Sequence, residues 1–228
     1  DSGLEVTPKN AGRIGVLVSS AMGGLTSLQD AIFTLKDHGA RRVSPFLIPM
    51  LMANGASGLI GIDHGIKGPA MSVASACASG IDGIGLAWMM LRSGMIDAAV
   101  TGASESTVTE IGVAAFDRIG ALSRRNDDFS MTPAPFDKNR DGLVMGEGAG
   151  ILVMETESHA KARGANILAE LAGYAATADA YHVTAPSSEG AGGAEAIRQA
   201  LATAQVNSDE VGYISAHGTA TPLNDASE

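Results

Sequence analysis

The sequence predicts an α/β fold built around a mostly parallel, layered sheet. Short apolar runs of the kind that fills a buried strand alternate with stretches of helical pattern, and this alternation is typical of parallel sheets covered by helices. Gly makes up 29 of the 228 residues, well above its usual share of roughly 7%. Aromatic residues are only 4%, so the core must be built from Ala, Val, Ile, Leu and Met. Such small residues let backbone layers approach closely, which favours a dense α/β fold over a loose helical bundle.

The first part of the chain is predicted to contain one strand and two helices. The apolar run 13–19 fits a buried strand, and 25–37 has the pattern of a helix. The segment 44–49 is apolar but is interrupted by two prolines, so we expect it to be irregular. A helix rich in Met, Ala and Gly is expected to follow and to end near Ile62.

The rest of the chain continues the alternation. Further strands are expected at 70–74, 97–101, 167–174 and 211–215, and further helices at 78–93, 157–163 and 193–204. The pattern of 142–155 indicates a strand or a hairpin. Residues 118–142 are polar and contain proline, which predicts a long loop, and long ordered loops are often functional.

The charge balance and the cysteine count exclude several classes of protein. The chain has 15 basic and 25 acidic residues, a net charge of −10, whereas nucleic-acid binding needs a basic field. No apolar run reaches the roughly 18 residues of a membrane span. The single Cys excludes an internal disulfide and a multi-Cys metal site. We therefore expect a cytoplasmic protein that binds neither nucleic acid nor membranes.

The first motif with chemical potential surrounds Cys77, in the stretch 73–80. It is predicted as a strand, a tight turn of small residues, and a helix that begins at or just after the cysteine. The free N–H groups at a helix N-terminus stabilise a thiolate and can hold a developing oxyanion. Cys77 is therefore a candidate nucleophile. The residues alone leave a second interpretation open, in which Cys77 is a buried small hydrophobe.

The second motif is the stretch 216–225, which begins with His217 at the end of a predicted strand. Ligands of α/β proteins bind outside the carboxyl ends of strands, so this histidine is a candidate base or hydrogen-bond donor. A structural histidine is the alternative, and 140 residues of separation from Cys77 cannot establish a pairing. The other histidines have no comparable context and are expected to be structural or at the surface: His38, His64, His159 and His182.

The third motif is the glycine-rich stretch 135–150. Its glycines do not have the GxGxxG spacing, no GK[ST] follows, and they lead into a predicted strand, so nucleotide binding is disfavoured. Closely packed backbone in a hairpin is the favoured interpretation.

Together the three motifs resemble the β-ketoacyl-acyl carrier protein synthases of the elongating class, class II of the condensing enzymes of fatty-acid synthesis. Ser75-Ala-Cys77-Ala-Ser-Gly is similar to the nucleophile motif, Pro135-Phe-Asp…Gly-Glu-Gly-Ala-Gly150 to the glycine-rich signature, and His217-Gly-Thr-Ala-Thr221 to the first histidine motif. The resemblance runs over the whole chain and includes 44–50 and 179–182.

The resemblance implies a thiolase-like fold of two similar halves in αβαβα layers, a homodimer, and acyltransferase chemistry. Residues 1–155 would be the remainder of the N-terminal half and 156–228 the start of the C-terminal half. Cys77 would accept an acyl chain from acyl carrier protein as a thioester, and His217 would assist the decarboxylation of malonyl-carrier protein. No cofactor is implied beyond the phosphopantetheine of acyl carrier protein.

The resemblance also implies roles for other residues. Thr219 and Thr221 match hydroxyls that hold the phosphopantetheine arm. Phe116 matches an aromatic at the active-site entrance, and Met22 a position at the acyl pocket. The remaining matches are the basic pair that receives the acidic carrier protein (Arg41 and Arg42), a neighbour on that docking face (Thr184), and two weak candidates for a monovalent-cation site (Asn224 and Glu228). No other metal is implied.

The chain also departs from the family pattern. The second histidine motif with its lysine, the gating loop, and the N-terminal strand and helix of the family have no counterpart. We therefore expect an incomplete central portion of a condensing enzyme that does not condense by itself. Three alternatives remain: a polyketide ketosynthase, a non-catalytic chain-length-factor-like subunit, and a generic binding module. Ala78 favours fatty-acid synthesis over the first, and the presence of Cys77 argues against the second. The acyl chain length is not determined by the sequence.

Overall fold

A computed structural model describes residues 2–127, 129–187 and 189–228. The chain divides into two compact units. The first comprises Asp1–Thr109 and Gly146–Glu170, and the second comprises Glu110–Met145 and Leu171–Glu228.

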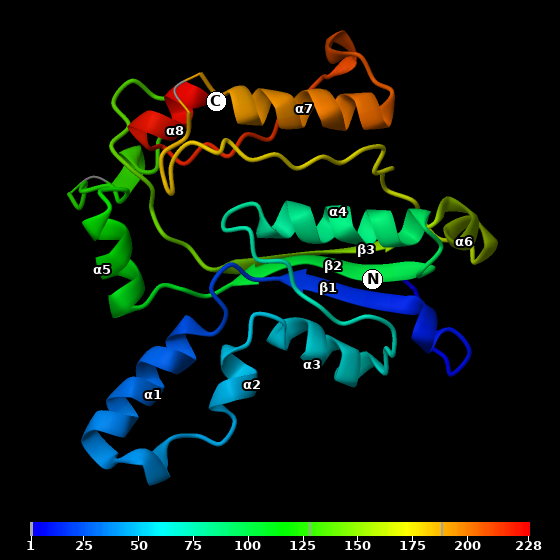
Figure 1. Cartoon of the computed structure of the whole chain (residues 1–228), viewed down its shortest axis with the longest axis horizontal. Helices are drawn as coiled ribbons and strands as arrows, with labels where there is room; N and C mark the ends of the chain where they lie inside the picture. Colours follow the sequence, from blue (N-terminus) through cyan, green and yellow to red (C-terminus); the bar gives the residue numbers. More distant parts are fainter. Residues whose placement is uncertain (1, 128, 188) are drawn as a thin grey trace. The chain divides into compact units, whose positions relative to one another are not determined.

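The first unit is built on a three-stranded sheet (Figure 1). β1 (Ile14–Ser19) pairs in parallel with β2 (Ala98–Glu105), and β2 pairs antiparallel with β3 (Gly148–Glu155). All six residues of β1 are buried, as the continuous apolar run predicts for a central strand covered on both faces. The strands predicted at 13–19 and 97–101 are confirmed. Of the strand or hairpin predicted at 142–155, the structure, which describes this whole stretch, has a strand from Gly148 that pairs with β2 and forms no local hairpin.

Helices cover both faces of this sheet. α4 (Ser79–Arg92) lies on one face and α3 (Gly55–His64) on the other (Figure 1). The core lies between α4 and the sheet and consists of Leu17, Ala87, Met90, Leu91, Ile96 and Ala99. This layering of helix, sheet and helix confirms the predicted α/β class.

Two glycines of α4 let this helix lie close to the sheet. A Cβ atom at Gly83 would lie 2.5 Å from the Oγ of Ser19, and one at Gly80 would lie 3.1 Å from the Cβ of Ala103. Because real Cβ atoms essentially never approach other atoms as closely as 2.5 Å, only glycine lets α4 lie at this height above β1 and β2. The glycine excess of the sequence therefore has a structural reason here.

The remaining elements of the first unit are mostly short. They are η1 (Ala11–Arg13), α1 (Leu25–His38), η2 (Ala40–Arg42), α2 (Leu47–Leu51) and α6 (Glu157–Ala162). The helix α2 corrects the prediction that 44–49 is irregular. Pro49 is the third residue of α2, where the backbone N–H would have no partner within the helix, so its absence costs nothing.

The strand predicted at 70–74 is wrong, although the segment runs beside β1. Ala70 forms a single bridge with Val16, and the N–H of Met71 donates to the carbonyl of Val16 at 3.0 Å. Serine hydroxyls make some of the hydrogen bonds that the backbone of a paired strand would make. Ser57 Oγ donates to the carbonyl of Met71 at 2.8 Å, and Ser19 Oγ accepts from the N–H of Val73 at 3.3 Å.

The second unit is helical in its regular parts. It contains α5 (Glu110–Arg118), η3 (Phe129–Met131), α7 (Ala191–Ala204), η4 (Ser208–Glu210) and α8 (Pro222–Ser227). The strand predicted at 211–215 is wrong, and so is the one at 167–174, which spans the unit boundary. Leu168 is 90% exposed and Tyr213 83% exposed, so these apolar runs have no ladder partner in the described part of the chain. The loop predicted at 118–142 is confirmed, apart from η3 and a bridge between Leu122 and Leu143.

Candidate functional site

Cys77 lies in an exposed turn directly before α4. The helix begins at Ser79, two residues after the cysteine, so the predicted turn and helix start are confirmed, although in the described part of the chain no strand directly precedes the turn. The N–H of Ala78 donates to the carbonyl of Ser75 at 3.2 Å and closes the turn. Cys77 is therefore presented to solvent at a helix N-terminus, and the interpretation as a buried small hydrophobe is wrong.

The residue before the nucleophile candidate has a strained backbone. Ala76 has φ +52°, in the left-handed region that costs an ordinary residue roughly 1–2 kcal/mol. Strain of this kind persists only where surrounding contacts hold it. Two hydrogen bonds of Ser79 do so: its Oγ accepts from the N–H of Ser75 at 2.9 Å and donates to the carbonyl of Ala76 at 2.6 Å.

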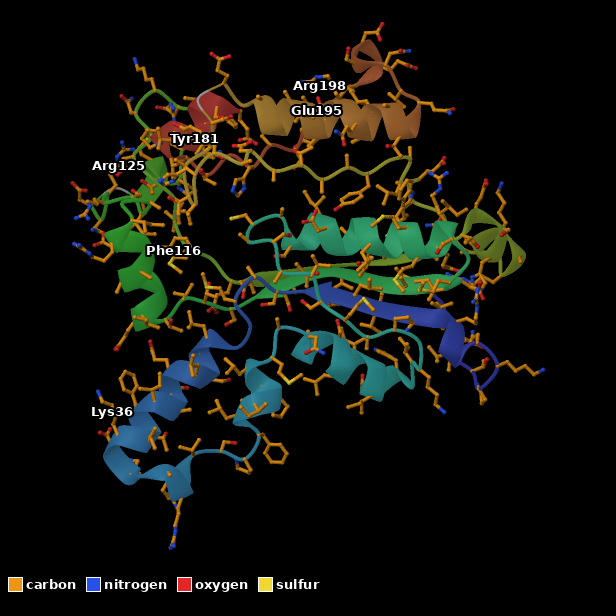
Figure 2. All side chains as sticks on the ribbon, viewed as in Figure 1. Lys36, Phe116, Arg125, Tyr181, Glu195 and Arg198 are labelled. Atoms are coloured by element: carbon orange, nitrogen blue, oxygen red, sulfur yellow. The ribbon has the colours of Figure 1, made fainter. Side chains whose placement is uncertain are left out.

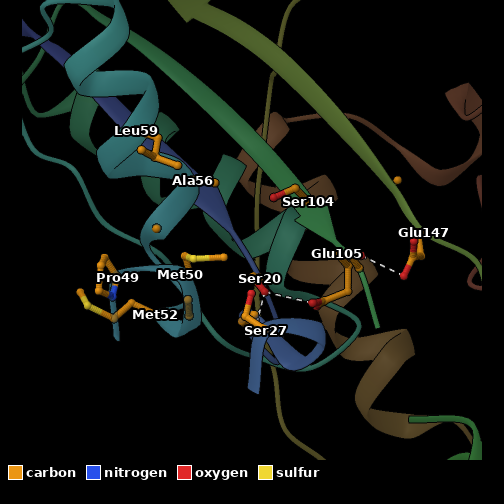
Figure 3. A pocket seen from close by; sticks show the side chains of 16 residues that line it. Ser20, Ser27, Pro49, Met50, Met52, Ala56, Leu59, Ser104, Glu105 and Glu147 are labelled. Atoms are coloured by element: carbon orange, nitrogen blue, oxygen red, sulfur yellow. Dashed lines mark hydrogen bonds between the residues drawn. The ribbon is translucent and has the colours of Figure 1, made fainter. Parts of the chain in front are cut away.

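A cavity of about 520 Å³ lies in the same unit, between the ends of β1 and β2 and the helices α2 and α3 (Figure 3). Met50, Met52 and Leu59 form its apolar side. Carboxylates lie at the other side, where Glu105 accepts from Ser20 Oγ at 3.0 Å and Glu147 accepts from Ser106 Oγ at 2.9 Å. These acceptors are occupied, so the cavity offers mainly apolar surface to a ligand.

Met22 is placed next to this cavity by sequence but does not line it. Ser20 and Gly23, which flank it, are lining residues, whereas the Met22 side chain is 48% exposed. The predicted position at an acyl pocket is not tested by this geometry and stays a prediction.

In the second unit, the turn at His217 is organised by Glu228. The carboxylate of Glu228 accepts from the N–H of His217 at 2.5 Å and from the N–H of Gly218 at 2.9 Å. The amide of Asn224 donates to the same carboxylate at 3.1 Å. Partial burial raises the pKa of Glu228, but these three hydrogen bonds outweigh that effect and hold the pKa below its usual range.

Thr219 and Thr221 lie side by side in the same turn. Their hydroxyl oxygens are 2.9 Å apart, and both residues are half-buried. Such a pair presents two adjacent hydroxyls that can donate to and accept from one polar chain. The structure thus brings together His217, Thr219, Thr221, Asn224 and Glu228 of the predicted residues, all within one short segment.

Sequence reasoning missed Asp225, which joins two of the three motifs. Its carboxylate accepts from the N–H of Phe136 at 2.7 Å and from the N–H of Ala220 at 3.1 Å. Arg140 Nε lies 3.4 Å from it, and the residue is 8% exposed. Phe136 and Arg140 belong to the glycine-rich motif, and Ala220 belongs to the histidine motif. An Asp just before the end of a short polar stretch carries no distinctive signal in the sequence.

The remaining predicted residues belong to other segments of their own units. Phe116 is half-buried on α5 (Figure 2). Arg41 and Arg42 are exposed on η2. Thr184 is exposed, and its N–H donates to the Nδ1 of His182 at 3.1 Å.

The described residues include no group of three or more His, Cys, Asp or Glu that could hold a metal ion. Over the same residues, no helix is long and apolar enough to cross a membrane.

In comparisons with known proteins, two family models together match nearly the whole chain. A family model described as "Beta-ketoacyl synthase, N-terminal domain" matches residues 1–160, and one described as "Beta-ketoacyl synthase, C-terminal domain" matches residues 168–228. The predicted boundary between 155 and 156 is not tested by these matches and stays a prediction.

Among curated proteins, the chain is 44% identical to a 3-oxoacyl-[acyl-carrier-protein] synthase 2 of Vibrio harveyi. It is 46% identical to the enzyme of that name from Staphylococcus aureus. Each match covers 100% of the chain and 55% or 56% of the relative. The chain therefore spans about half the length of these curated relatives.

Among solved structures, the chain is similar to one chain of a complex described as "type II PKS acyl-carrier protein in complex with its ketosynthase bound to the hexaketide". The TM-score is 0.92 at 32% identity, and the match covers 97% of this chain and 56% of the other. The predicted thiolase-like fold is thereby confirmed.

Proposed function

The chain belongs to the β-ketoacyl synthase family, and from this premise we propose that it serves the elongation of fatty acids. The reaction is the decarboxylative Claisen condensation of malonyl-acyl carrier protein with an acyl chain held on Cys77, which gives 3-oxoacyl-acyl carrier protein. The observation that carries this proposal is the exposed turn that presents Cys77 at the N-terminus of α4. No cofactor is needed beyond the phosphopantetheine of the carrier.

In the first step, the Sγ of Cys77 attacks the carbonyl carbon of the acyl thioester. A carbon–sulfur bond to Cys77 forms as the bond to the pantetheine sulfur breaks, and the carrier leaves as a free thiol. The backbone N–H of Cys77, at the positive end of the α4 dipole, stabilises the oxyanion that develops on the carbonyl oxygen. The acyl chain is then held covalently, which divides a difficult condensation into two easier steps.

In the second step, the malonyl thioester loses carbon dioxide and leaves an enolate. His217 donates a hydrogen bond to the enolate oxygen, and the enolate carbon attacks the thioester on Cys77. A carbon–carbon bond forms, the carbon–sulfur bond to Cys77 breaks, and the thiolate is regenerated. The contacts of Glu228 with the N–H groups of His217 and Gly218 support this role, because they fix the backbone from which the imidazole extends.

The substrate arm has several proposed contacts. The adjacent hydroxyls of Thr219 and Thr221 hold the phosphopantetheine, and their separation of 2.9 Å supports a shared polar partner. Phe116 lies at the entrance, and Met22 borders the acyl chain. The apolar cavity between Ser20 and Leu59 supports a site for such a chain in this part of the first unit.

The proposed partners are acyl carrier protein and a second copy of the enzyme, in the cytoplasm. Arg41 and Arg42 are adjacent, exposed bases in a chain of net charge −10, and an acidic carrier is attracted to such a pair. Thr184 is proposed to belong to the same docking face. Asn224 and Glu228 are proposed to lie near a monovalent cation.

Variants of the two catalytic residues test this function. In Cys77→Ala, acyl loading should fall by at least about a thousandfold because no nucleophile remains. Cys77→Gln should abolish condensation but retain malonyl decarboxylation. His217→Ala should retain loading and lose decarboxylation. Loading is measured by the mass of the acyl-enzyme, and decarboxylation by the release of carbon dioxide. Acyl loading that survives in Cys77→Ala would contradict the proposal.

A further inference from the structure

We propose that Ser79 is a positioning residue for Cys77: its hydroxyl holds Ala76 in the left-handed conformation from which the nucleophile is presented. The inference rests on the proposed function, since it concerns the geometry of the acyl-accepting thiol. Ser79 does not touch the reacting atoms in this role. It acts through the backbone of the residue before the cysteine.

The two hydrogen bonds of the Ser79 hydroxyl lie on either side of the strained residue. Ser79 Oγ accepts from the N–H of Ser75 at 2.9 Å and donates to the carbonyl of Ala76 at 2.6 Å. One hydroxyl thus connects the amide that precedes the strained region to the carbonyl that follows the Ala76 Cα. Rotation of Ala76 to a negative φ would break this connection. The hydroxyl is therefore a direct restraint on φ +52°.

The helix that carries Ser79 is held rigidly. Ser79 is the first residue of α4 and only 3% exposed. The helix behind it is seated on the sheet through Gly80 and Gly83, where no Cβ atom fits without displacing a neighbour. The Ser79 hydroxyl is consequently fixed relative to β1 and β2, and the turn that it holds is fixed with it.

A third contact ties the same turn to the next part of the helix. Ser75 Oγ donates to the carboxylate of Asp82 in a short hydrogen bond, so Ser75 is held both by its N–H and by its hydroxyl. Asp82 lies in the first turn of α4, where a carboxylate is favoured by the helix dipole. The backbone before Ala76 cannot move without breaking contacts to two side chains of α4.

The restraint by Ser79 determines the fraction of molecules in which Cys77 is oriented for acyl transfer. The dihedral angles of Ala76 determine where the Cys77 Sγ and the Cys77 N–H point. Without the hydroxyl, the turn can relax to unstrained conformations that direct both groups elsewhere, and the competent fraction falls. The loss should appear in the maximal rate of acyl transfer and not in the binding of the carrier.

The experiment compares Ser79→Ala with Ser79→Ala combined with Ala76→Gly. Glycine adopts positive φ about as readily as negative φ, so the double variant reaches the competent conformation without the restraint. Ser93→Ala is the matched control, because Ser93 Oγ donates to the carbonyl of Met90 at 3.0 Å at the other end of α4. The readouts are the maximal rate and apparent KM of acyl loading from acyl-carrier protein, and Trp88 fluorescence as a measure of folding.

We expect Ser79→Ala to lower the maximal loading rate about tenfold, as for the loss of one buried hydrogen-bonding group, with the apparent KM unchanged. The added Ala76→Gly change should recover most of that loss, and Ser93→Ala should stay within about twofold of the wild type. A wild-type loading rate in Ser79→Ala would overturn the inference. So would a folded double variant that recovers nothing. Failure of the proposed function would instead appear as no loading on the wild-type protein.

Discussion

The turn at Cys77 and the turn at His217 each hold a residue in a strained backbone conformation, but different chemical groups hold it. Each contains an alanine in the left-handed region, Ala76 at φ +52° and Ala220 at φ +62°. The first is restrained by the neutral hydroxyl of Ser79. The second is held by the carboxylate of Asp225, which accepts from the N–H of Ala220 at 3.1 Å.

The difference shows which forces each turn depends on. The Cys77 turn depends on packing, because its restraint sits on a helix that glycines seat against the sheet. The His217 turn precedes a short helix, α8, and has no strand beside it among the residues that the structure describes. Its geometry depends on the ionised groups of Asp225 and Glu228. Mutations and pH should therefore affect the two turns differently.

The largest effect is expected for Asp225→Asn. The amide group would direct hydrogens toward one of the two backbone N–H groups that the carboxylate now accepts from, and Arg140 would lose its buried partner. We expect a loss of about 3 to 5 kcal/mol in the stability of the second unit. All three tyrosines lie in that unit, so denaturant unfolding followed by their near-ultraviolet circular dichroism measures the change.

Asp209→Asn is the control for this variant. Asp209 is exposed in η4 of the same unit, so it loses the same charge without a buried network. Its effect should be close to zero. Equal effects of the two substitutions would show that net charge, and not the Asp225 contacts, stabilises the turn.

A somewhat smaller effect is expected for Gly83→Ala, which tests the packing of the Cys77 turn. The new Cβ atom would lie 2.5 Å from Ser19 Oγ and 3.3 Å from the carbonyl oxygen of Leu17, both in fully buried residues. We expect a loss of about 2 to 3 kcal/mol in the first unit. Trp88, the single tryptophan, lies on the same helix and reports this unfolding.

Gly58→Ala provides the matched glycine. It lies within α3, and a Cβ atom there would meet nothing within 4 Å. Alanine should therefore stabilise the helix by up to about 1 kcal/mol. If Gly83→Ala also stabilised the unit, the close seating of α4 on the sheet would not be the basis of the Cys77 turn.

The smallest effect is a local response to pH. The pKa of Glu228 is lowered, so its contacts with the His217 turn are complete above the usual carboxyl range near 4.3 and are lost as the pH falls through the lowered value. Hydrogen exchange of the His217 and Gly218 amides, corrected for intrinsic rates, should lose protection in that window. The Ser79 amide, which donates to the carbonyl of Ala76 at 3.1 Å, should not. Identical pH profiles for the three amides would remove the distinction between the turns.

Local signals explain what could be predicted from the sequence. The continuous apolar run of β1 and the turn of small residues before α4 were recognisable because their side-chain pattern reflects burial within a few residues. The same reasoning failed at 70–74, 167–174 and 211–215. These runs have strand-like residues, but a strand also needs a ladder partner, and a local pattern carries no information about one.

Long-range contacts explain what was missed. Nothing in the sequence around Asp225 indicates that its carboxylate accepts from the N–H of Phe136, which lies 89 positions earlier. The sequence likewise does not show that the carboxylate of Glu228 accepts from the N–H groups of His217 and Gly218; its predicted place near a cation is a separate matter and stays a prediction. Neither arrangement has a spacing that could reveal it.

The sequence by itself determined the α/β class, the family motifs and the identity of Cys77 and His217 as the reactive candidates, because these depend on residue types within short windows. Its excess of glycine also indicated closely approaching layers, as found where Gly83 lies against Ser19. The left-handed conformation of Ala76 became visible only in the structure, although the hydrogen bonds of Ser79 that hold it span only three and four residues. Only the tertiary structure joined the glycine-rich and histidine motifs through Asp225. Those features are contacts between side chains and backbone groups, and a sequence pattern does not show which groups come into contact.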